Sequence, residues 1–252
     1  MPRQVGHISI FMEKQKDISV VILGYKAGDS LFSFHKKVVN ALEEKNLSYE
    51  IIIVGNYRPE SGDITPIVVK KISENNPNTL SIIEEKTDSK QAMGWDMRSG
   101  LRLAKGKTIC VIDGDGQMPA KDIPLVYLKL INEKLDLCKT KRVSREDGFY
   151  RKIISRIFNA IMNLIFPGIV AGDINGKPKI FTKEAFEKLH LESDDWFIDS
   201  EIMIKARRYK FKIGEVETCF YKNKDYSSSI TFKTNLEFIK NIIISRLKEF
   251  KK

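Results

Sequence analysis

The sequence predicts an α/β fold with a mostly parallel central sheet that is flanked by helices. Short β-branched runs alternate with amphipathic helical segments from residue 18 to residue 133. The interiors of these runs are uniformly apolar, as in strands that helices cover on both faces. The chain has 252 residues, of which 42% are hydrophobic. This is enough for one large core.

The first part of the chain is a regular series of strands and helices. Strands are predicted over residues 18–25, 49–55, 80–85, 107–113 and 135–141. Helices are predicted over residues 29–46, 64–75, 91–104 and 121–133. In the first helix, Leu31, Phe34, Val38 and Leu42 recur on one face. Because ligands of such sheets bind beyond the carboxyl ends of the strands, polar residues at those ends are the candidates for a site.

The regular alternation stops after this series. The sequence then predicts a basic loop, an apolar helix, a second loop, a helix that begins near residue 194, and a last strand. These segments cover residues 139–152, 153–166, 171–181, 194 onward and 212–222. No internal repeat or low-complexity linker divides the chain. We expect an N-terminal extension at 1–17, one α/β domain at 18–233 and a basic amphipathic helix at 234–252.

The charge balance favours an anionic partner. Lys and Arg outnumber Asp and Glu by 43 to 33, which gives a formal net charge of +10. Nucleic acid, a phosphorylated substrate and a membrane surface all fit this charge. The three cysteines form no CxxC pair, so neither a disulfide framework nor a thiolate zinc site is expected. The sequence shows no secretory signal and no run long enough to span a bilayer, so we expect a cytoplasmic protein.

Asp113, Asp115 and Gln117 follow one another at alternate positions where the strand at 107–113 ends. Residues two apart in extended backbone point to the same side, so these three can converge. Three oxygen ligands suit Mg²⁺ or Mn²⁺, and the intervening glycines would let a diphosphate approach closely. A polar turn is the alternative interpretation of this pattern.

Other acidic and phosphate-binding motifs do not fit. A calcium loop of the EF-hand type needs Gly at its sixth position and Glu at its twelfth, where this chain has Met118 and Pro124. A phosphoaspartate phosphatase resembles DxDx[TV] on the first strand, whereas here the strand is the fourth and Gln117 takes the last position. The chain has no GxxxxGK[ST] or GxGxxG motif, and its three histidines have no companions for a triad or a metal cluster.

Seven segments occur in a characteristic order: SVVILGYK, YEIIIVGN, MGWDMRSGLRLAKG, VIDGDGQMP, RKIISRIFN, DINGKPKIF and FIDSEIMIKARRYKFKIGEVE. This order resembles the family 2 glycosyltransferases of GT-A (Rossmann-like) fold. Within them it is most similar to the polyprenyl-phosphate sugar transferases, the group of dolichol-phosphate mannose synthase. The resemblance covers roughly residues 18–245 and would make the domain at 18–233 a GT-A domain.

The resemblance implies roles for residues on the donor side. Asp115 and Gln117 would bind Mg²⁺ or Mn²⁺, with Asp113 beside the ribose and diphosphate of a GDP- or UDP-linked sugar. Further donor contacts are expected at the first strand's exit and at a helix start: Leu23, Gly24, Tyr25, Gly94 and Arg98. The family usually carries an Asp pair after its second strand, where this chain has Gly55 and Asn56. Asn56 is therefore the candidate there, and the base stays open.

A basic and apolar segment suggests the acceptor. Arg151, Ser155 and Asn159 recur at helical spacing on an apolar segment, 153–166, and Arg142 lies just upstream. Guanidinium groups bind phosphate oxygens in a forked geometry, and an apolar helix suits a lipid tail. The resemblance implies that Arg142 and Arg151 hold an acceptor phosphate, with Ser155 beside them. A helix that packs on the core, with solvated arginines at its end, is the alternative.

Two further acids have open roles. Asp199 lies in WFIDSEI, where related transferases with hydroxyl acceptors place a base, and is the candidate for contacting sugar or acceptor. The alternative is a solvated helix start in which Glu201 pairs with Lys205. Asp173, in GDING, matches a recurring family acid that lines the pocket. A turn-stabilising Asp explains it equally well.

Three functions follow from these observations. The first is an inverting, metal-dependent transferase that moves a sugar to a dolichyl- or undecaprenyl-type phosphate at the cytoplasmic membrane face. It would be held there peripherally or by a membrane protein, because the basic helix at 234–252 can lie in a membrane interface or close the core. The second is a family 2 transferase with a hydroxyl acceptor in polysaccharide or glycolipid synthesis. The third is a non-catalytic sugar-nucleotide binder. No aromatic and basic stacking stripe supports nucleic acid.

Overall fold

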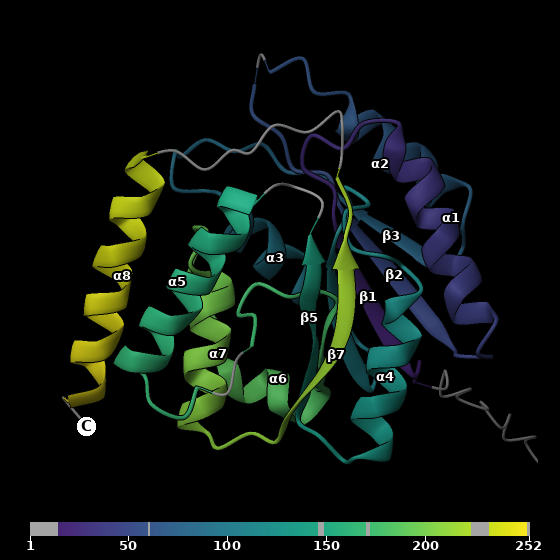
Figure 1. Cartoon of the computed structure of the whole chain (residues 1–252). Helices are drawn as coiled ribbons and strands as arrows, with labels where there is room; N and C mark the ends of the chain where they lie inside the picture. The colour runs from purple at the N-terminus through teal and green to yellow at the C-terminus, as the bar shows by residue number, and fades with distance from the viewer. Residues whose placement is uncertain (1–14, 60, 146–148, 170–171, 223–231, 251–252) are drawn as a thin grey trace, which may run out of the picture.

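The computed structural model describes residues 15–59, 61–145, 149–169, 172–222 and 232–250. The strands are β1 (Ile18–Leu23), β2 (Tyr49–Val54), β3 (Thr79–Ile82), β4 (Thr108–Asp113), β5 (Leu137–Arg145), β6 (Lys179–Thr182) and β7 (Ile213–Phe220). The helices are α1 (Ser30–Glu43), α2 (Thr65–Glu74), α3 (Met93–Leu101), α4 (Asp122–Asn132), α5 (Phe149–Ile165), α6 (Lys183–Leu189), α7 (Ile198–Arg208) and α8 (Phe232–Phe250). The strands form one sheet in the order β3-β2-β1-β4-β6-β5-β7 (Figure 1).

The centre of the sheet is parallel and in register. β1 pairs with β2 on one side and β4 on the other, and β2 pairs with β3, all in parallel. Leu23 stands level with Val54 of β2 and with Asp113 of β4. The carboxyl ends of three neighbouring strands therefore meet at one edge of the sheet.

Two segments predicted as loops contain strands. The end of the predicted loop 171–181 forms β6, which runs antiparallel to β4 and β5. β5 continues through Arg145 into the predicted loop 139–152, because it pairs with β7 along its length. Both strands contain charged residues, so the sequence does not mark them as strands. Both are ordered by pairing with strands that lie far away in the sequence. In addition, α5 begins at Phe149 rather than 153, and α6, which Thr182 caps, was not predicted.

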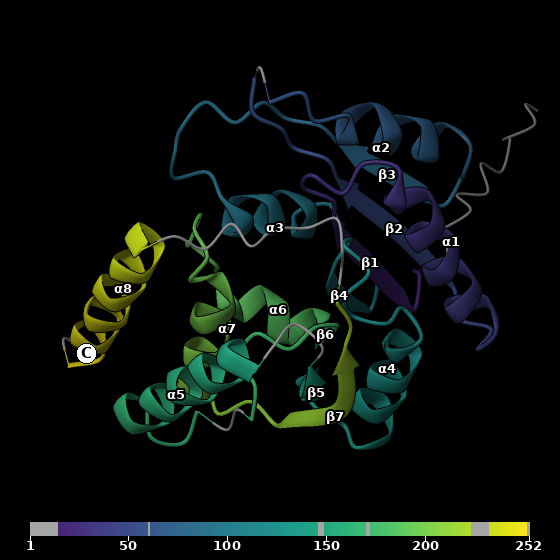
Figure 2. The ribbon, with the colours of Figure 1, turned by 45° about the horizontal axis from the view of Figure 1, so that its top comes forward.

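Side chains of the strands alternate between two apolar cores. Along β1, Val21 and Leu23 belong to one core, whereas Val20 and Ile22 belong to the other. Helices α1, α2 and α4 cover the second core, and helices α3, α6 and α7 cover the first (Figures 1 and 2). The predicted mostly parallel α/β sheet with helices on both faces is confirmed.

Helices α5 and α8 lie beside α7 at the outer edge of the first core (Figure 2). Phe238 of α8 contacts Phe158 of α5 and Phe197 at ring-centroid distances of 5.5 and 5.7 Å. Met162 of α5 and Ile242 of α8 are buried, so each helix does close the core. No helix among the described residues is long and apolar enough to cross a membrane.

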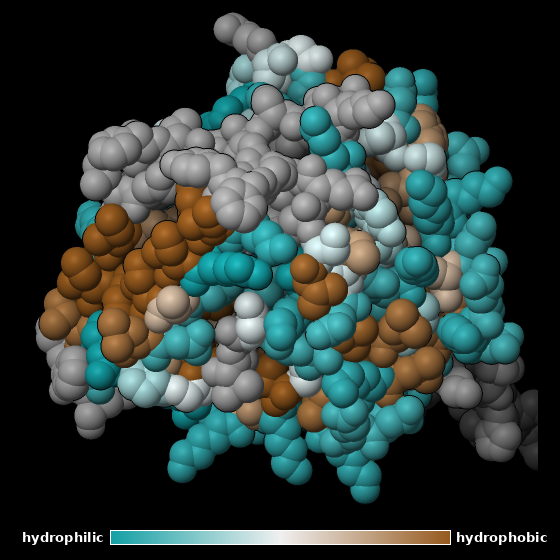
Figure 3. Space-filling view, in the orientation of Figure 1, coloured by the Kyte–Doolittle hydropathy of each residue, from teal (hydrophilic) through white to brown (hydrophobic). Residues whose placement is uncertain are grey.

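The outer faces of α5 and α8 are apolar as well. Figure 3 shows a hydrophobic area on this side of the molecule. Its exposed members are Ile153, Ile154, Ile157, Ile161 and Leu164 of α5, with Ile239, Ile243, Ile244 and Leu247 of α8. We call these nine residues the α5/α8 apolar surface. Exposed apolar groups of this extent are typical of interaction surfaces.

Candidate active site

The candidate site lies at the carboxyl ends of β1, β2 and β4. The N–H of Gly24 donates to the carbonyl of Val54 at 2.8 Å, and that of Gly114 donates to the carbonyl of Leu23 at 2.8 Å. A Cβ atom at Gly24 would lie 3.0 Å from the Val54 carbonyl oxygen. Glycine therefore permits this close approach. Tyr25 follows directly and is half-buried at the strand exit.

Asp113 ends β4, and Asp115 and Gln117 follow it in a turn. The N–H of Gln117 donates to Asp115 Oδ1 at 2.9 Å, and its side-chain amide donates to the carbonyl of Tyr221 at 3.1 Å. Burial, and next the charge of Asp113, raise the pKa of Asp115 to about 6. The two carboxyl groups therefore repel one another across the turn.

The residues of this turn fit a divalent ion. Two carboxylates and an amide oxygen are the hard ligands that Mg²⁺ and Mn²⁺ prefer. A bound cation would also offset the repulsion that raises the pKa of Asp115. Among the described residues, no three His, Cys, Asp or Glu side chains form a metal cluster. By the chemistry of their oxygen atoms, Asp113, Asp115 and Gln117 could hold an ion here, and their assignment as ligands stays a prediction.

Two lysines that the sequence analysis did not single out form the base of the site. Lys177 Nζ lies 3.0 Å from Asp113 Oδ1 and 3.1 Å from Asp199 Oδ2. Lys179 Nζ lies 2.5 Å from Asp199 Oδ1. These lysines and Asp199 are almost fully buried. Lys177 meets Asp113 across 64 residues of sequence and Lys179 meets Asp199 across 20, so no local pattern marked these lysines.

The lysines determine the charge of Asp199. Burial alone would raise the pKa of Asp199, but the charges of Lys177 and Lys179 outweigh it and lower the pKa to about 2. The Lys205 pair with Glu201 is present at 2.6 Å. However, Asp199 itself is not part of a solvated helix start. It is a buried anion whose two oxygens are each paired with a lysine.

Two acceptor-side candidates bind each other. Arg142 Nε lies 2.5 Å from Asp173 Oδ2, and Arg142 Nη2 lies 2.7 Å from Asp173 Oδ1. Burial would raise the pKa of Asp173, but Arg142 outweighs it and lowers the pKa. The Arg142 guanidinium also lies over the ring of Phe220 at 5.3 Å. A phosphate at Arg142 would therefore meet a guanidinium that Asp173 already orients.

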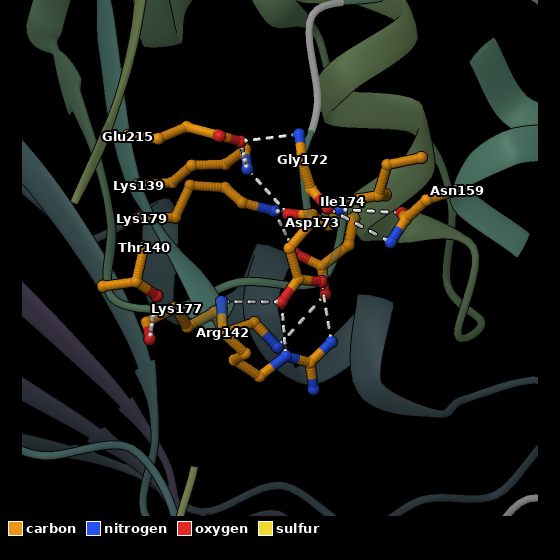
Figure 4. Close-up of polar contacts among 11 residues, drawn as sticks. Lys139, Thr140, Arg142, Asn159, Gly172, Asp173, Ile174, Lys177, Lys179 and Glu215 are labelled. Carbon is orange, nitrogen blue, oxygen red and sulfur yellow. Dashed lines mark hydrogen bonds and ion pairs between the residues drawn. The ribbon is translucent and has the colours of Figure 1, made fainter. Parts of the chain in front are cut away.

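The segment 172–177, which we call the acceptor-side loop, is fixed from several elements (Figure 4). Lys139 of β5 donates to the carbonyl of Asp173 at 2.6 Å and pairs with Glu215 of β7 at 2.5 Å. Thr140 Oγ1 donates to the carbonyl of Lys177 at 2.6 Å. Asn159 of α5 accepts from the N–H of Ile174 at 3.2 Å. The loop is thus tied to β5, β7 and α5.

The remaining acceptor candidates lie on α5. Ser155 is half-buried, one helical turn before Asn159, which contacts the acceptor-side loop. Arg151 lies in the first turn of α5, and its side chain is outside the described residues. The predicted phosphate contacts of Arg151 and Ser155 therefore remain predictions.

Asn56, a candidate for contacting the donor, is buried just beyond the end of β2. Its side-chain nitrogen donates to Asp96 Oδ1 at 3.0 Å, and its oxygen accepts from the N–H of Glu84 at 2.8 Å. Lys86 Nζ pairs with Asp96 at 2.5 Å and lies 4.3 Å from the ring centroid of Tyr25. Asn56 is 1% exposed. No local sequence pattern marks Lys86 or Asp96, because their partners lie in other segments of the chain.

The two α3 candidates contact the segment before α7. A Cβ atom at Gly94 would lie 2.6 Å from the carbonyl oxygen of Asp195, so only glycine fits this contact. Arg98 donates to the carbonyl of Glu192 at 2.9 Å and pairs with Asp194. Both residues hold α3 against this segment, and their contact with a donor stays a prediction.

The resemblance predicts a mostly parallel sheet with paired acids at the end of a central strand. The structure has this arrangement at β4. The family described as Glycosyl transferase family 2 matches residues 19–190. The chain therefore belongs to the family 2 glycosyltransferases.

Among curated proteins, the chain is similar to an undecaprenyl-phosphate 4-deoxy-4-formamido-L-arabinose transferase of Salmonella choleraesuis. The identity is 27% over 147 residues, which cover 58% of this chain and 43% of that protein. A protein of the same description from Salmonella paratyphi B matches to the same extent. The matched region thus spans less than half the length of these relatives.

Among solved structures, the chain resembles glucosyl-3-phosphoglycerate synthase of Mycobacterium tuberculosis in complex with Mn²⁺, UDP and phosphoglyceric acid. The TM-score is 0.65 at 13% identity, covering 92% of this chain and 78% of that one. Mannosyl-3-phosphoglycerate synthase of Rubrobacter xylanophilus gives 0.64 at 13% identity, covering 94% and 75%. At these identities the likeness concerns the fold, and it confirms the expected GT-A architecture.

Proposed function

We propose that the protein transfers a sugar, with inversion, from a GDP- or UDP-linked donor to a polyprenyl phosphate, in a reaction that depends on Mg²⁺ or Mn²⁺. Family membership supports sugar transfer. The curated relatives, named as undecaprenyl-phosphate sugar transferases, support the acceptor class. The oxygen ligands at the end of β4 support the use of a metal ion. One protein of similar fold was crystallised with Mn²⁺ and UDP.

The state of Asp199 is the observation that favours a phosphate acceptor over a hydroxyl. A hydroxyl acceptor needs a general base whose pKa lies near the working pH. Lys177 and Lys179 occupy both oxygens of Asp199 and hold its pKa at about 2, so it is a poor proton acceptor. A lipid monophosphate, with a second pKa of about 6, already carries an anionic oxygen near neutral pH. It requires positioning rather than deprotonation.

The chemistry divides between the two sides of the site. A divalent ion supplies a Lewis acid for the negative charge that grows on the leaving diphosphate. Asp113, Asp115 and Gln117 would hold that ion, while Tyr25 and the β1 exit receive the nucleotide. Arg142, oriented by Asp173, would position the acceptor phosphate.

The α5/α8 apolar surface supports a location at the membrane. A polyprenyl phosphate presents its phosphate at the bilayer surface while its chain stays in the hydrocarbon. Helix α5 carries part of the apolar surface and also contacts the acceptor-side loop through Asn159. We therefore propose that the protein binds the membrane peripherally with α5 and α8 toward the lipid, and we expect this on the cytoplasmic face.

A screen of donors against acceptors tests this function. Labelled UDP- and GDP-sugars are incubated with Mn²⁺ and one of three acceptors: a short polyprenyl phosphate, the matching polyprenol or a saccharide. We expect label in the lipid phase only with the phosphorylated acceptor. Transfer to polyprenol or to a saccharide hydroxyl alone would favour the second function. Donor binding without transfer to any acceptor would favour a non-catalytic sugar-nucleotide binder.

A further inference from the structure

Lys177 places a buried positive charge directly against a carboxylate of the expected metal site. Its Nζ lies 3.0 and 3.2 Å from the two oxygens of Asp113, so both oxygens face one ammonium group. The same Nζ lies 3.1 Å from Asp199. The side chain of Lys177 is 2% exposed, whereas that of Asp113 is 31% exposed. The carboxylate of Asp113 therefore faces the open site, while Lys177 already balances its negative charge on the buried side.

Asp199 does not depend on Lys177 alone. Lys179 pairs with its other oxygen at 2.5 Å and also donates to the carbonyl of Ile174 at 3.0 Å. Asp199 thus keeps a lysine partner if Lys177 is replaced. Asp113, by contrast, has its ion pair with Lys177. The charge of Lys177 consequently bears most directly on the donor side of the site.

An ammonium group in contact with Asp113 repels a divalent ion that binds to the same turn. A nucleoside diphosphate carries negative charge to that turn and would offset the repulsion. We propose that Lys177 is a positioning residue that weakens the binding of a free divalent ion and makes metal binding depend on the donor's diphosphate. This inference rests on the proposed use of a metal ion and a nucleotide donor, but not on the identity of the acceptor.

Lys139 provides a matched control. It is fully buried, it pairs with Glu215, and it donates to the acceptor-side loop at Asp173. It differs in making no contact with Asp113. A merely structural effect of losing a buried lysine should appear in Lys139→Met as well as in Lys177→Met. An effect on the metal site should appear only in the latter.

The test measures Mn²⁺ binding by electron paramagnetic resonance, first with Mn²⁺ alone and then with added UDP or GDP. Lys177→Met and Lys177→Gln both remove the charge, and Gln retains a hydrogen-bond donor if Met impairs folding. We expect both neutral variants to bind Mn²⁺ alone at least about tenfold more tightly than wild type. Nucleoside diphosphate should strengthen Mn²⁺ binding more in wild type than in either variant. Lys139→Met and Lys177→Arg should bind Mn²⁺ as wild type does.

Several results would overturn the proposal. These are unchanged or weaker Mn²⁺ binding in the folded neutral variants, a gain of equal size in Lys177→Arg or Lys139→Met, and no Mn²⁺ binding in any of the proteins. Circular dichroism establishes that each variant is folded. Because no acceptor is present, a failure to transfer sugar to polyprenyl phosphate would reject the proposed acceptor and leave this measurement standing.

Discussion

Arg142 and Asp173 form a two-point ion pair, with Nε 2.5 Å from Oδ2 and Nη2 2.7 Å from Oδ1. The Arg142 N–H also donates to Asp173 Oδ2 at 3.2 Å. Both side chains are less than 10% exposed, at 9% and 6%. Asp173 thus joins β5 to the acceptor-side loop. This contact between two segments goes beyond the turn-stabilising Asp that the sequence suggested as the alternative.

Asp173→Asn should destabilise the fold and impair acceptor use. Removing one partner of a buried ion pair leaves the other charge uncompensated, which costs about 3 kcal/mol of unfolding free energy. Urea denaturation measures this change. Glu74→Gln is the control, because its pair with Lys70 is exposed and 3.9 Å long and should matter by less than about 0.5 kcal/mol. Equal effects of the two substitutions would contradict the structural role of Asp173.

Asp115→Asn should abolish metal-dependent transfer yet stabilise the metal-free protein. The pKa of Asp115 is about 6 in the folded chain, above its ordinary value of 3.8. A raised carboxyl pKa means that stability is lost as the pH rises from about 4 to 6. The variant should therefore be more stable than wild type by about 3 kcal/mol above pH 6, with the difference vanishing below pH 4.

Urea denaturation with chelator present, at a series of pH values, checks this prediction. Undiminished transfer by Asp115→Asn in excess chelator would reject the metal assignment. A variant that is less stable than wild type at pH 7 would show that Asp115 is not strained by burial and by Asp113.

Asp199→Asn should remove stability that the wild type shows at neutral pH. Its folded pKa is about 2, below the ordinary value of 3.8, so its contribution is complete above about pH 4 and is lost as the pH falls toward 2. We expect a cost of about 3 kcal/mol at pH 7, because two buried lysines lose a partner. In urea denaturation the difference from wild type should shrink as the pH falls from about 4 to about 2. A difference that is independent of pH would argue against the ion pairs.

Substitutions on the α5/α8 apolar surface should weaken lipid binding without unfolding the protein. Ile157 and Leu164 are 54% and 80% exposed. Ile157→Ser with Leu164→Ser should reduce association with anionic lipid vesicles by about tenfold or more, since each side chain buried in the interface contributes about 1–2 kcal/mol. Vesicle cosedimentation measures this. Ile67→Ser, at a site 59% exposed on α2, should bind vesicles as wild type does.

The sequence predicted most of the sheet and the position of the acidic turn, because these depend on local patterns. Apolar runs mark β1, β2 and β4, and Asp113 and Asp115 adjoin such a run directly. The lysines escaped prediction for a physical reason. Lys177 meets Asp113 across 64 residues of sequence, and nothing local distinguishes a lysine that will be buried from one that will be solvated.

The structure adds protein partners to residues whose roles come from the resemblance, and those roles stay predictions. The amide of Asn56, a candidate for contacting the donor, is bonded to Asp96 and to the backbone of Glu84. Arg142, a candidate phosphate ligand, is bonded to Asp173. Hydrogen-bond partners depend on how distant elements pack, so sequence alone identified these residues without identifying what they bind.

The reversed direction of β6 has a consequence for how the two halves of the site can vary. A strand that runs against its neighbours enters the sheet at the edge where they leave it, so the segment before β6 reaches the end of β4 without a long connection. Val111 stands opposite Lys179 in this pairing, and the ladder therefore brings Lys177 to Asp113. Changes of sequence at residues 172–176, before Lys177, could then alter the surroundings of the proposed acceptor while the parallel strands at the proposed donor site keep their register.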